Sequence, residues 1–73
     1  MEQAPEEIPV SEARSNFTDV IAQTRLLRQC IFLTRRGKPQ VAVVPVELGE
    51  AARNVGGVEA AIKILSEHQR RVS

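Results

Sequence analysis

The segment CIFLTRRGKPQVAVVP (residues 30–45) decides the fold of this 73-residue chain. Two short runs rich in Ile, Phe and Val stand on either side of a gap that contains a glycine and a proline. Such runs, separated by such a gap, are typical of a β-hairpin. The sequence therefore predicts strands over residues 30–34 and 40–44, joined by a turn over residues 35–39.

The tip of this predicted hairpin is strongly basic, because Arg35, Arg36 and Lys38 all fall within the turn. A basic tip on a small sheet favours a partner that carries phosphate groups. Charge alone is equally compatible with a solvated surface loop. The meaning of the tip therefore depends on what lies elsewhere in the chain.

Upstream of the hairpin, residues 11–23 are expected to form an amphipathic helix. Ser11 is expected to cap its N-terminus, since a serine hydroxyl accepts a hydrogen bond from an amide two or three residues on. One helical face gathers mostly apolar residues and the opposite face polar ones. The mostly apolar face comprises Ala13, Phe17, Val20, Ile21 and Thr24. The polar face comprises Arg14, Ser15, Thr18 and Asp19.

Shorter elements flank this helix. Residues 1–7 are polar and expected to be frayed. Residues 8–10 are expected to form a very short strand at a sheet edge, because Pro9 cannot donate a backbone hydrogen bond. Residues 24–29 mix leucines with arginines, and a second short helical turn is one way to place both leucines on the sheet.

Two helices are expected after the hairpin. The first covers residues 46–53 and stops at the glycine pair Gly56-Gly57. The second covers residues 58–72, where an apolar stripe recurs at helical spacing and needs a surface to cover it. The stripe comprises Val58, Ala61, Ile62, Leu65 and Val72. The chain is accordingly expected to divide into residues 1–55 and residues 56–73, the second a hinge with a partner-binding helix.

Length and composition favour a single small domain that dimerises. A chain of 73 residues buries a modest core, and chains of this size commonly add a disulfide, a metal or a partner chain. Cys30 is the sole cysteine, and no group of residues has the spacing of metal ligands, so a homodimer is expected and no metal or cofactor. No apolar run approaches membrane-span length, and the N-terminus lacks the pattern of an export signal. A cytoplasmic protein is expected.

Catalysis is not expected. The single histidine, His68, lies in a polar tail, and Cys30 begins a strand, where a cysteine is usually a small core residue. The glycines do not have the spacing of a phosphate-binding loop. With a net charge of +1, any nucleic-acid binding must depend on a local cluster of cations.

The candidate DNA-binding residues come from two places in the chain. Arg14 and its neighbours Ser15 and Asn16 lie on the first predicted helix, and the other candidates lie at the hairpin tip. Arginine can read guanine with two hydrogen bonds, whereas lysine tends to hold phosphate. The full set is Arg14, Arg35, Ser15, Asn16, Arg36 and Lys38.

Two motifs give the chain a family resemblance. Residues 10–16 (V-S-E-A-R-x-N) and residues 33–39 (L-T-R-R-G-K-P) occur in the order and spacing of the Phd/YefM (prevent-host-death) antitoxins of bacterial type II toxin–antitoxin modules. The resemblance covers roughly residues 8–48.

The resemblance implies an α+β fold: a small antiparallel sheet, made of the short N-terminal strand and the hairpin, with an N-terminal amphipathic helix and C-terminal helices. It implies a homodimer that binds operator DNA, represses its own operon and can form a higher assembly with toxin. Residues 1–55 would be the DNA-binding and dimerisation domain. Family members use the arginines that correspond to Arg14 and Arg35 on DNA. A C-terminal segment would neutralise a cognate toxin. The expected toxin-binding residues are Val58, Ala61, Ile62 and Leu65.

The chain departs from the family pattern in two places. Many relatives have a Glu-Ala-Gly type of turn where this chain has Leu-Leu-Arg-Gln (residues 26–29). Toxin-binding tails are often longer and acidic, whereas this one is short and ends in His-Gln-Arg-Arg (residues 68–71) before its last two residues. Two alternatives therefore stand beside the antitoxin: a solitary transcription regulator without a toxin, and a protein-interaction module whose cations are only solvated.

Overall fold

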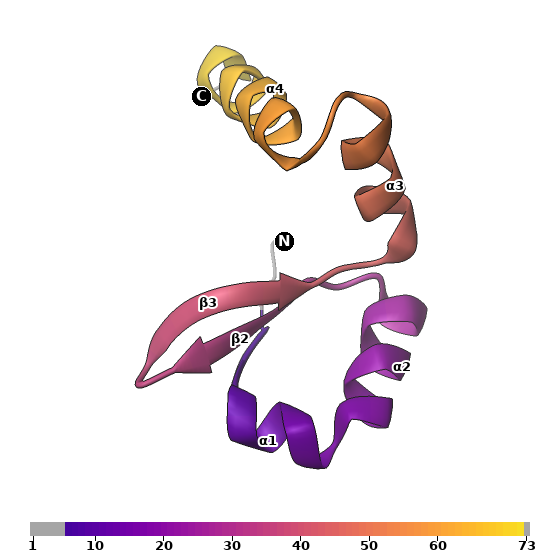
Figure 1. The fold of residues 1–73 in the computed structure, drawn as a ribbon, viewed down its shortest axis with the longest axis vertical. Coiled ribbons are helices and arrows are strands. Elements are labelled where there is room, and N and C mark those ends of the chain that lie inside the picture. Colours follow the sequence, from indigo (N-terminus) through magenta and orange to yellow (C-terminus); the bar gives the residue numbers. More distant parts are fainter. Residues whose placement is uncertain (1–5, 73) are drawn as a thin grey trace.

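The computed structural model describes residues 6–72 and confirms the α+β class (Figure 1). Its elements in order are β1 (Glu6–Pro9), α1 (Val10–Ser15), α2 (Phe17–Leu27), β2 (Ile31–Arg35), β3 (Lys38–Val43), α3 (Val46–Asn54) and α4 (Val58–Val72). Of the segment expected to be frayed, residues 1–5 lie outside the described part. Glu6 and Glu7 belong to β1, so for them the expectation is wrong.

The sheet is mixed, and the prediction of a wholly antiparallel sheet is wrong. Its strand order is β1-β2-β3, with β2 antiparallel to β3 and parallel to β1. The cause is the connection from β1 to β2. Helices α1 and α2 carry the chain back along the sheet between those strands, and such a crossover makes two neighbouring strands parallel.

The hairpin is confirmed, with a tighter tip than the predicted five-residue turn. Arg36 and Gly37 form a two-residue tip with φ values of 55° and 80°. Two positive φ values in succession are the mark of a type I′ turn, which matches the twist of the flanking strands. Pro39 lies within β3 and pairs with Thr34, whereas a strand boundary was expected before residue 40. The edge position of β3 tolerates the proline.

The first predicted helix is interrupted at Asn16, so the expectation of one continuous helix is wrong. Asn16 has φ −125° and ψ 38°, outside the helical range. Its backbone N–H donates to Glu12 O at 3.1 Å and its side-chain Nδ2 to the same oxygen at 3.4 Å. An asparagine side chain that competes for backbone groups in this way is poorly suited to a helix interior.

The boundaries of the two resulting helices also differ from the prediction. The N-cap of α1 is Pro9, and Ser11 lies inside the first turn without a capping hydrogen bond. Helix α2 continues to Leu27 and ends at Arg28, whose φ of 57° is left-handed. The segment over residues 24–29 is therefore mostly the last turn of α2.

The core lies between the sheet and helices α1 and α2. Ala13, Val20 and Ile31 are buried, and Ile8, Leu33 and Val43 pack around them. Two threonines, Thr24 and Thr34, are buried with this cluster. Phe17 and Ile21 were expected on the same helical face, but each is about half exposed. Val20 and Thr24, four residues apart, are the buried residues of α2, so Phe17 and Ile21 lie beside its buried face and not on it.

Helices α3 and α4 form a second part of the molecule, as Figure 1 shows. Their predicted spans are confirmed to within one residue. Gly56 and Gly57, with φ values of 117° and 115°, turn the chain between them. The two helices pack against each other across the predicted boundary at residue 55. Among the described helices, none is long and apolar enough to cross a membrane.

Candidate nucleic-acid interface

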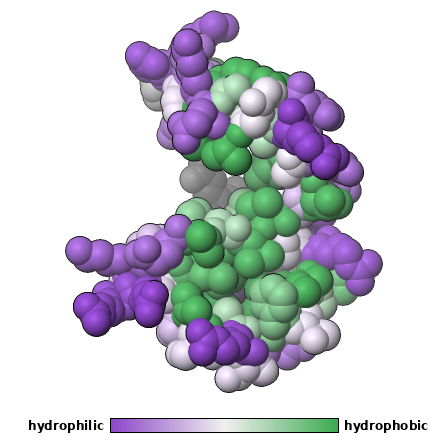
Figure 2. Space-filling view, viewed as in Figure 1, coloured by the Kyte–Doolittle hydropathy of each residue, from purple (hydrophilic) through white to green (hydrophobic). Residues whose placement is uncertain are grey.

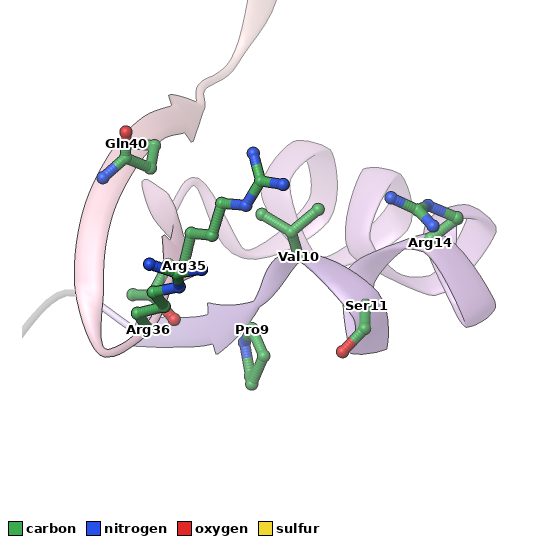
Figure 3. A pocket seen from close by; sticks show the side chains of 8 residues that line it. Pro9, Val10, Ser11, Arg14, Arg35, Arg36 and Gln40 are labelled. Carbon is green, nitrogen blue, oxygen red and sulfur yellow. The ribbon is translucent and has the colours of Figure 1, made fainter.

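Three of the six candidate DNA-binding residues line one open groove, shown in Figure 3. Arg14 comes from α1, Arg35 from the end of β2 and Arg36 from the hairpin tip. The groove has a volume of about 400 Å³. The remaining lining residues are Pro9, Val10, Ser11, Thr34 and Gln40.

The parallel pairing of β1 with β2 is what forms this groove. Pro9 pairs with Thr34, the residue before Arg35. The chain enters α1 immediately after Pro9, so the first turns of α1 start beside the hairpin tip. Figure 3 shows the Arg35 side chain extending over Val10, with Arg14 further along α1. Two motifs that are some twenty residues apart in the sequence thus form one surface.

The other three candidates are not among the groove-lining residues. The Ser15 hydroxyl donates to Ser11 O at 3.3 Å, and the Asn16 amide group donates to Glu12 O, so both side chains bond within their own helix region. Lys38 is the cross-strand neighbour of Arg35, but it does not line the groove. The structure therefore brings Arg14, Arg35 and Arg36 together and leaves Ser15, Asn16 and Lys38 outside.

Two lining residues were missed by sequence reasoning. Ser11 was assigned to a cap, yet it lines the groove beside Arg14. Gln40 lies where the pairing of β2 with β3 shifts register, since Thr34 pairs with Pro39 and Leu33 with Val41. The unpaired Gln40 therefore occupies a β-bulge, a feature that often redirects a side chain near functional sites. Nothing in the local sequence distinguishes it from an ordinary strand residue.

The groove is electrostatically suited to an anion. No acidic residue is among its lining residues, and the three arginines are exposed to solvent. Arginine guanidinium groups bind phosphate with paired hydrogen bonds. Ser11, Thr34 and Gln40 add polar side chains to the same lining. The arrangement can therefore hold a phosphate backbone or a base edge.

The candidate toxin-binding residues divide between two sides of α4. Ala61 and Leu65 line an apolar hollow between α3 and α4, while Val58 and Ile62 do not line it and are exposed. None of the seven residues lining this hollow is polar. Helix α4 thus presents more apolar surface than α3 covers.

A third feature joins the two parts of the molecule. Arg28, at the end of α2, and Glu47, in the first turn of α3, form an ion pair at the edge of a hollow that Thr24, Val43 and other residues also line. The pKa of Glu47 is lowered by its own backbone N–H and then by the hydrogen bond and charge of Arg28. Within residues 6–72, no group of His, Cys, Asp and Glu side chains is placed to hold a metal ion.

Comparison with known proteins finds no matching family model, no matching curated protein and no matching solved structure.

Proposed function

We propose that the protein is a dimeric DNA-binding repressor of its own operon and the antitoxin of a type II toxin–antitoxin module. Arg14 and Arg35 contact operator DNA, and α4 binds and neutralises a cognate toxin. The protein acts by binding and not by catalysis. Its place of action is the bacterial cytoplasm.

One observation carries the DNA-binding half of the proposal: Arg14 and Arg35 line the same groove. They are the two arginines to which the family resemblance assigns DNA contact. If Arg14 and Arg35 were only scattered surface cations, there would be no reason for both to line one groove without an acidic lining residue. Arg36, from the hairpin tip, adds a third charge to the same lining.

Dimerisation would make such a small surface adequate. One groove of this size offers few contacts, whereas specific protein–DNA interfaces bury roughly 1,000–2,500 Å² of protein surface. Two grooves related by a two-fold axis would contact two half-sites of a palindrome. The exposed apolar side chains of the chain, among them Val41 of β3, provide surface for a second copy.

The toxin-binding half rests on the exposed apolar residues of α4. Val58, Ile62 and Leu65 are each more than half exposed on a helix that carries charge on its other side. Binding of an amphipathic helix in an apolar groove is a recurring mode of recognition between proteins. A solitary regulator has no toxin to bind and would not need an exposed apolar stripe on α4, so the stripe favours a protein partner.

The DNA assignment is tested with the intact protein and the DNA upstream of its own gene. Arg14→Ala and Arg35→Ala should each weaken binding by about 1–3 kcal/mol if they read bases, or lower the salt slope by about 1 if they hold phosphates. Arg53→Ala, which removes the same charge from α3 outside the groove, is the matched control. Fluorescence anisotropy over a series of salt concentrations measures both quantities.

The interaction-module alternative predicts a different result in the same experiment. It requires that operator affinity be equal for the wild type and for both groove variants, with no preference over unrelated DNA. That outcome would remove DNA binding from the proposal and leave the partner-binding half intact.

The toxin assignment is tested separately by capture from the native host. The whole chain should retain a small partner protein, and a chain that ends at Asn54 should lose it while still binding DNA. A chain that represses its operon and captures no partner in either form would be a solitary regulator. A reading frame of toxin size beside the gene identifies the first protein to test.

A further inference from the structure

Helix α4 carries a second apolar row, which shares only Leu65 with the residues that line the hollow against α3. Val58, Ile62, Leu65, Gln69 and Val72 recur at alternating spacings of four and three residues. That alternation is the core pattern of helices that pair along their length. The four apolar members are 66%, 52%, 57% and 68% exposed. Leu65 also borders the hollow against α3, but more than half of each of these four side chains is left uncovered by the chain itself.

Helix α4 needs cover on this row to be a stable element. At about 1.5 Å per residue, its 15 residues span about 22 Å, a length at which an isolated helix is marginal in water. Helix α3 contributes one contact surface, formed by Leu48, Ala51, Ala52 and Val55. The hollow of about 200 Å³ between the helices is lined only by apolar residues and is itself open. The hairpin of α3 and α4 therefore resembles half of a four-helix bundle.

The charges of α4 indicate what covers the row. Glu59 lies in its first turn and Arg70 and Arg71 in its last. In a parallel pair of two such helices, the two acidic ends would lie together and the two basic ends would lie together, so like charges would repel. In an antiparallel pair, the acidic end of one helix lies beside the basic end of the other, and the helix dipoles are opposed as well.

We infer that the hairpin of α3 and α4 packs against the same hairpin of a second copy, with the two α4 helices antiparallel and Leu65 opposite Leu65. In this register Val58 lies opposite Val72, and Gln69 lies one residue from the position opposite Ile62, near the helix end, where its amide still reaches solvent. The pairing does not depend on DNA or on a toxin.

This pairing uses residues that the proposed function assigns to the toxin. Val58, Ile62 and Leu65 cannot contact a second copy and a toxin at the same time. A toxin that binds α4 must therefore displace the second copy from it. The apparent affinity of the toxin for α4 would then rise as the antitoxin concentration falls, because a smaller fraction of α4 is paired with a second copy.

Cysteine cross-linking of the full chain tests the pairing and its direction. In a Cys30→Ala background, Leu65→Cys should cross-link to its own copy under mild oxidation. A mixture of the Val58→Cys and Val72→Cys proteins should form the mixed dimer, and Val58→Cys alone should not cross-link. Circular dichroism of each variant is the control that checks whether it is folded.

Two results would overturn the inference. One is a folded Leu65→Cys protein that stays uncross-linked at concentrations where the wild type is associated. The other is faster cross-linking of Val58→Cys with itself than with Val72→Cys, which would mean a parallel pair.

A matched pair of substitutions tests the row itself. In the Leu65→Cys protein, Ile62→Gln should weaken association through α4 about tenfold, the change expected for loss of one apolar contact of about 1.4 kcal/mol. Lys63→Gln introduces the same side chain one position along, outside the row, and should leave the cross-linking yield unchanged. Equal yields from both variants would contradict the assigned row.

Discussion

Arg28 Nη1 donates to Glu47 Oε1 at 3.0 Å and so joins the end of α2 to the first turn of α3. The left-handed backbone of Arg28, with φ 57°, ends α2 at this residue. Both side chains are exposed, so the pair contributes little to global stability. Its position matters more, because it spans the junction between the two parts of the molecule seen in Figure 1.

The Arg28–Glu47 pair predicts a small acid-dependent change. The pKa of Glu47 is lowered in the folded protein by its own backbone N–H and then by Arg28, so these interactions stabilise the fold above the unfolded-state pKa. That contribution is lost as the pH falls through the lower folded-state pKa. Glu47→Gln should therefore flatten this part of the dependence of thermal stability on pH. Glu50→Gln, which removes the same charge three residues further along α3, is the matched control.

Thr24 predicts a stabilising substitution. Its side chain is 3% exposed, and its Oγ1 has no hydrogen-bond partner among the described residues. Thr24→Val removes an unsatisfied buried hydroxyl at nearly constant volume and should stabilise the fold by about 1 kcal/mol. The expected rise in Tm is about 4–8 °C for a domain of this size.

Thr34 provides the matched control for Thr24. Its buried Oγ1 donates to Ile8 O at 3.3 Å and so ties β2 to β1. Thr34→Val should destabilise the fold by about 1 kcal/mol, because it removes this hydrogen bond between the two strands. Urea unfolding of both variants compares them directly. A loss of stability in Thr24→Val equal to that in Thr34→Val would mean that the Thr24 hydroxyl does form a hydrogen bond.

The hairpin tip predicts a conflict between stability and DNA binding. Arg36 has a φ of 55°, a conformation that asparagine adopts more readily than arginine. An Asn-Gly pair is strongly favoured in a type I′ turn. Arg36→Asn should thus stabilise the fold by about 0.5 kcal/mol and weaken operator binding through the lost charge. Unchanged operator affinity in the stabilised variant would exclude Arg36 from the DNA interface.

Two glycines predict opposite effects of the same substitution. Gly57, with φ 115°, turns the chain between α3 and α4, so Gly57→Ala should destabilise the packing of those helices by about 1–3 kcal/mol. Gly49 lies inside α3 with open space around its added Cβ. Gly49→Ala should stabilise α3 by about 0.5–1 kcal/mol. Amide hydrogen exchange in α3 and α4 measures both effects.

The apolar side chains exposed on the surface are a further reason to measure self-association of these variants together with their stability. Figure 2 shows apolar residues gathered in the bend between the sheet and the two C-terminal helices. Phe17, Leu26 and Val46 are among the large apolar side chains that the chain exposes. A chain with so small a buried core is expected to cover part of this surface with a partner. Each stability comparison is therefore best made at one fixed protein concentration.

Much of the fold follows from local patterns in the sequence. The glycine in Arg36-Gly37 favours a tight hairpin tip, and Gly56-Gly57 separates two helices whose spans were predicted to within one residue. These features depend on backbone preferences and on apolar periodicity, which act over a few residues. The interruption at Asn16 was missed, because a regular apolar spacing on both sides of it outweighed the polar side chain.

The candidate site could be predicted only in part. The two arginines Arg14 and Arg35 were singled out through a motif resemblance, but Ser11 and Gln40 were not recognised as their neighbours in the groove. Ser15 and Asn16 were included by proximity in sequence, whereas their side chains bond within their own helix region. Side-chain direction depends on the backbone path, which sequence proximity does not specify.

The sequence by itself determined the hairpin, its basic tip and the two C-terminal helices, because each depends on interactions between residues close in the chain. The tertiary structure alone decided that β1 lies parallel to β2. That pairing places Pro9 beside Thr34 and so brings α1 to the hairpin tip, where Arg14 and Arg35 share a groove. The pairing is a long-range one, and its register is selected by burial of Ile8 and Ile31 in a common core, which no local pattern encodes.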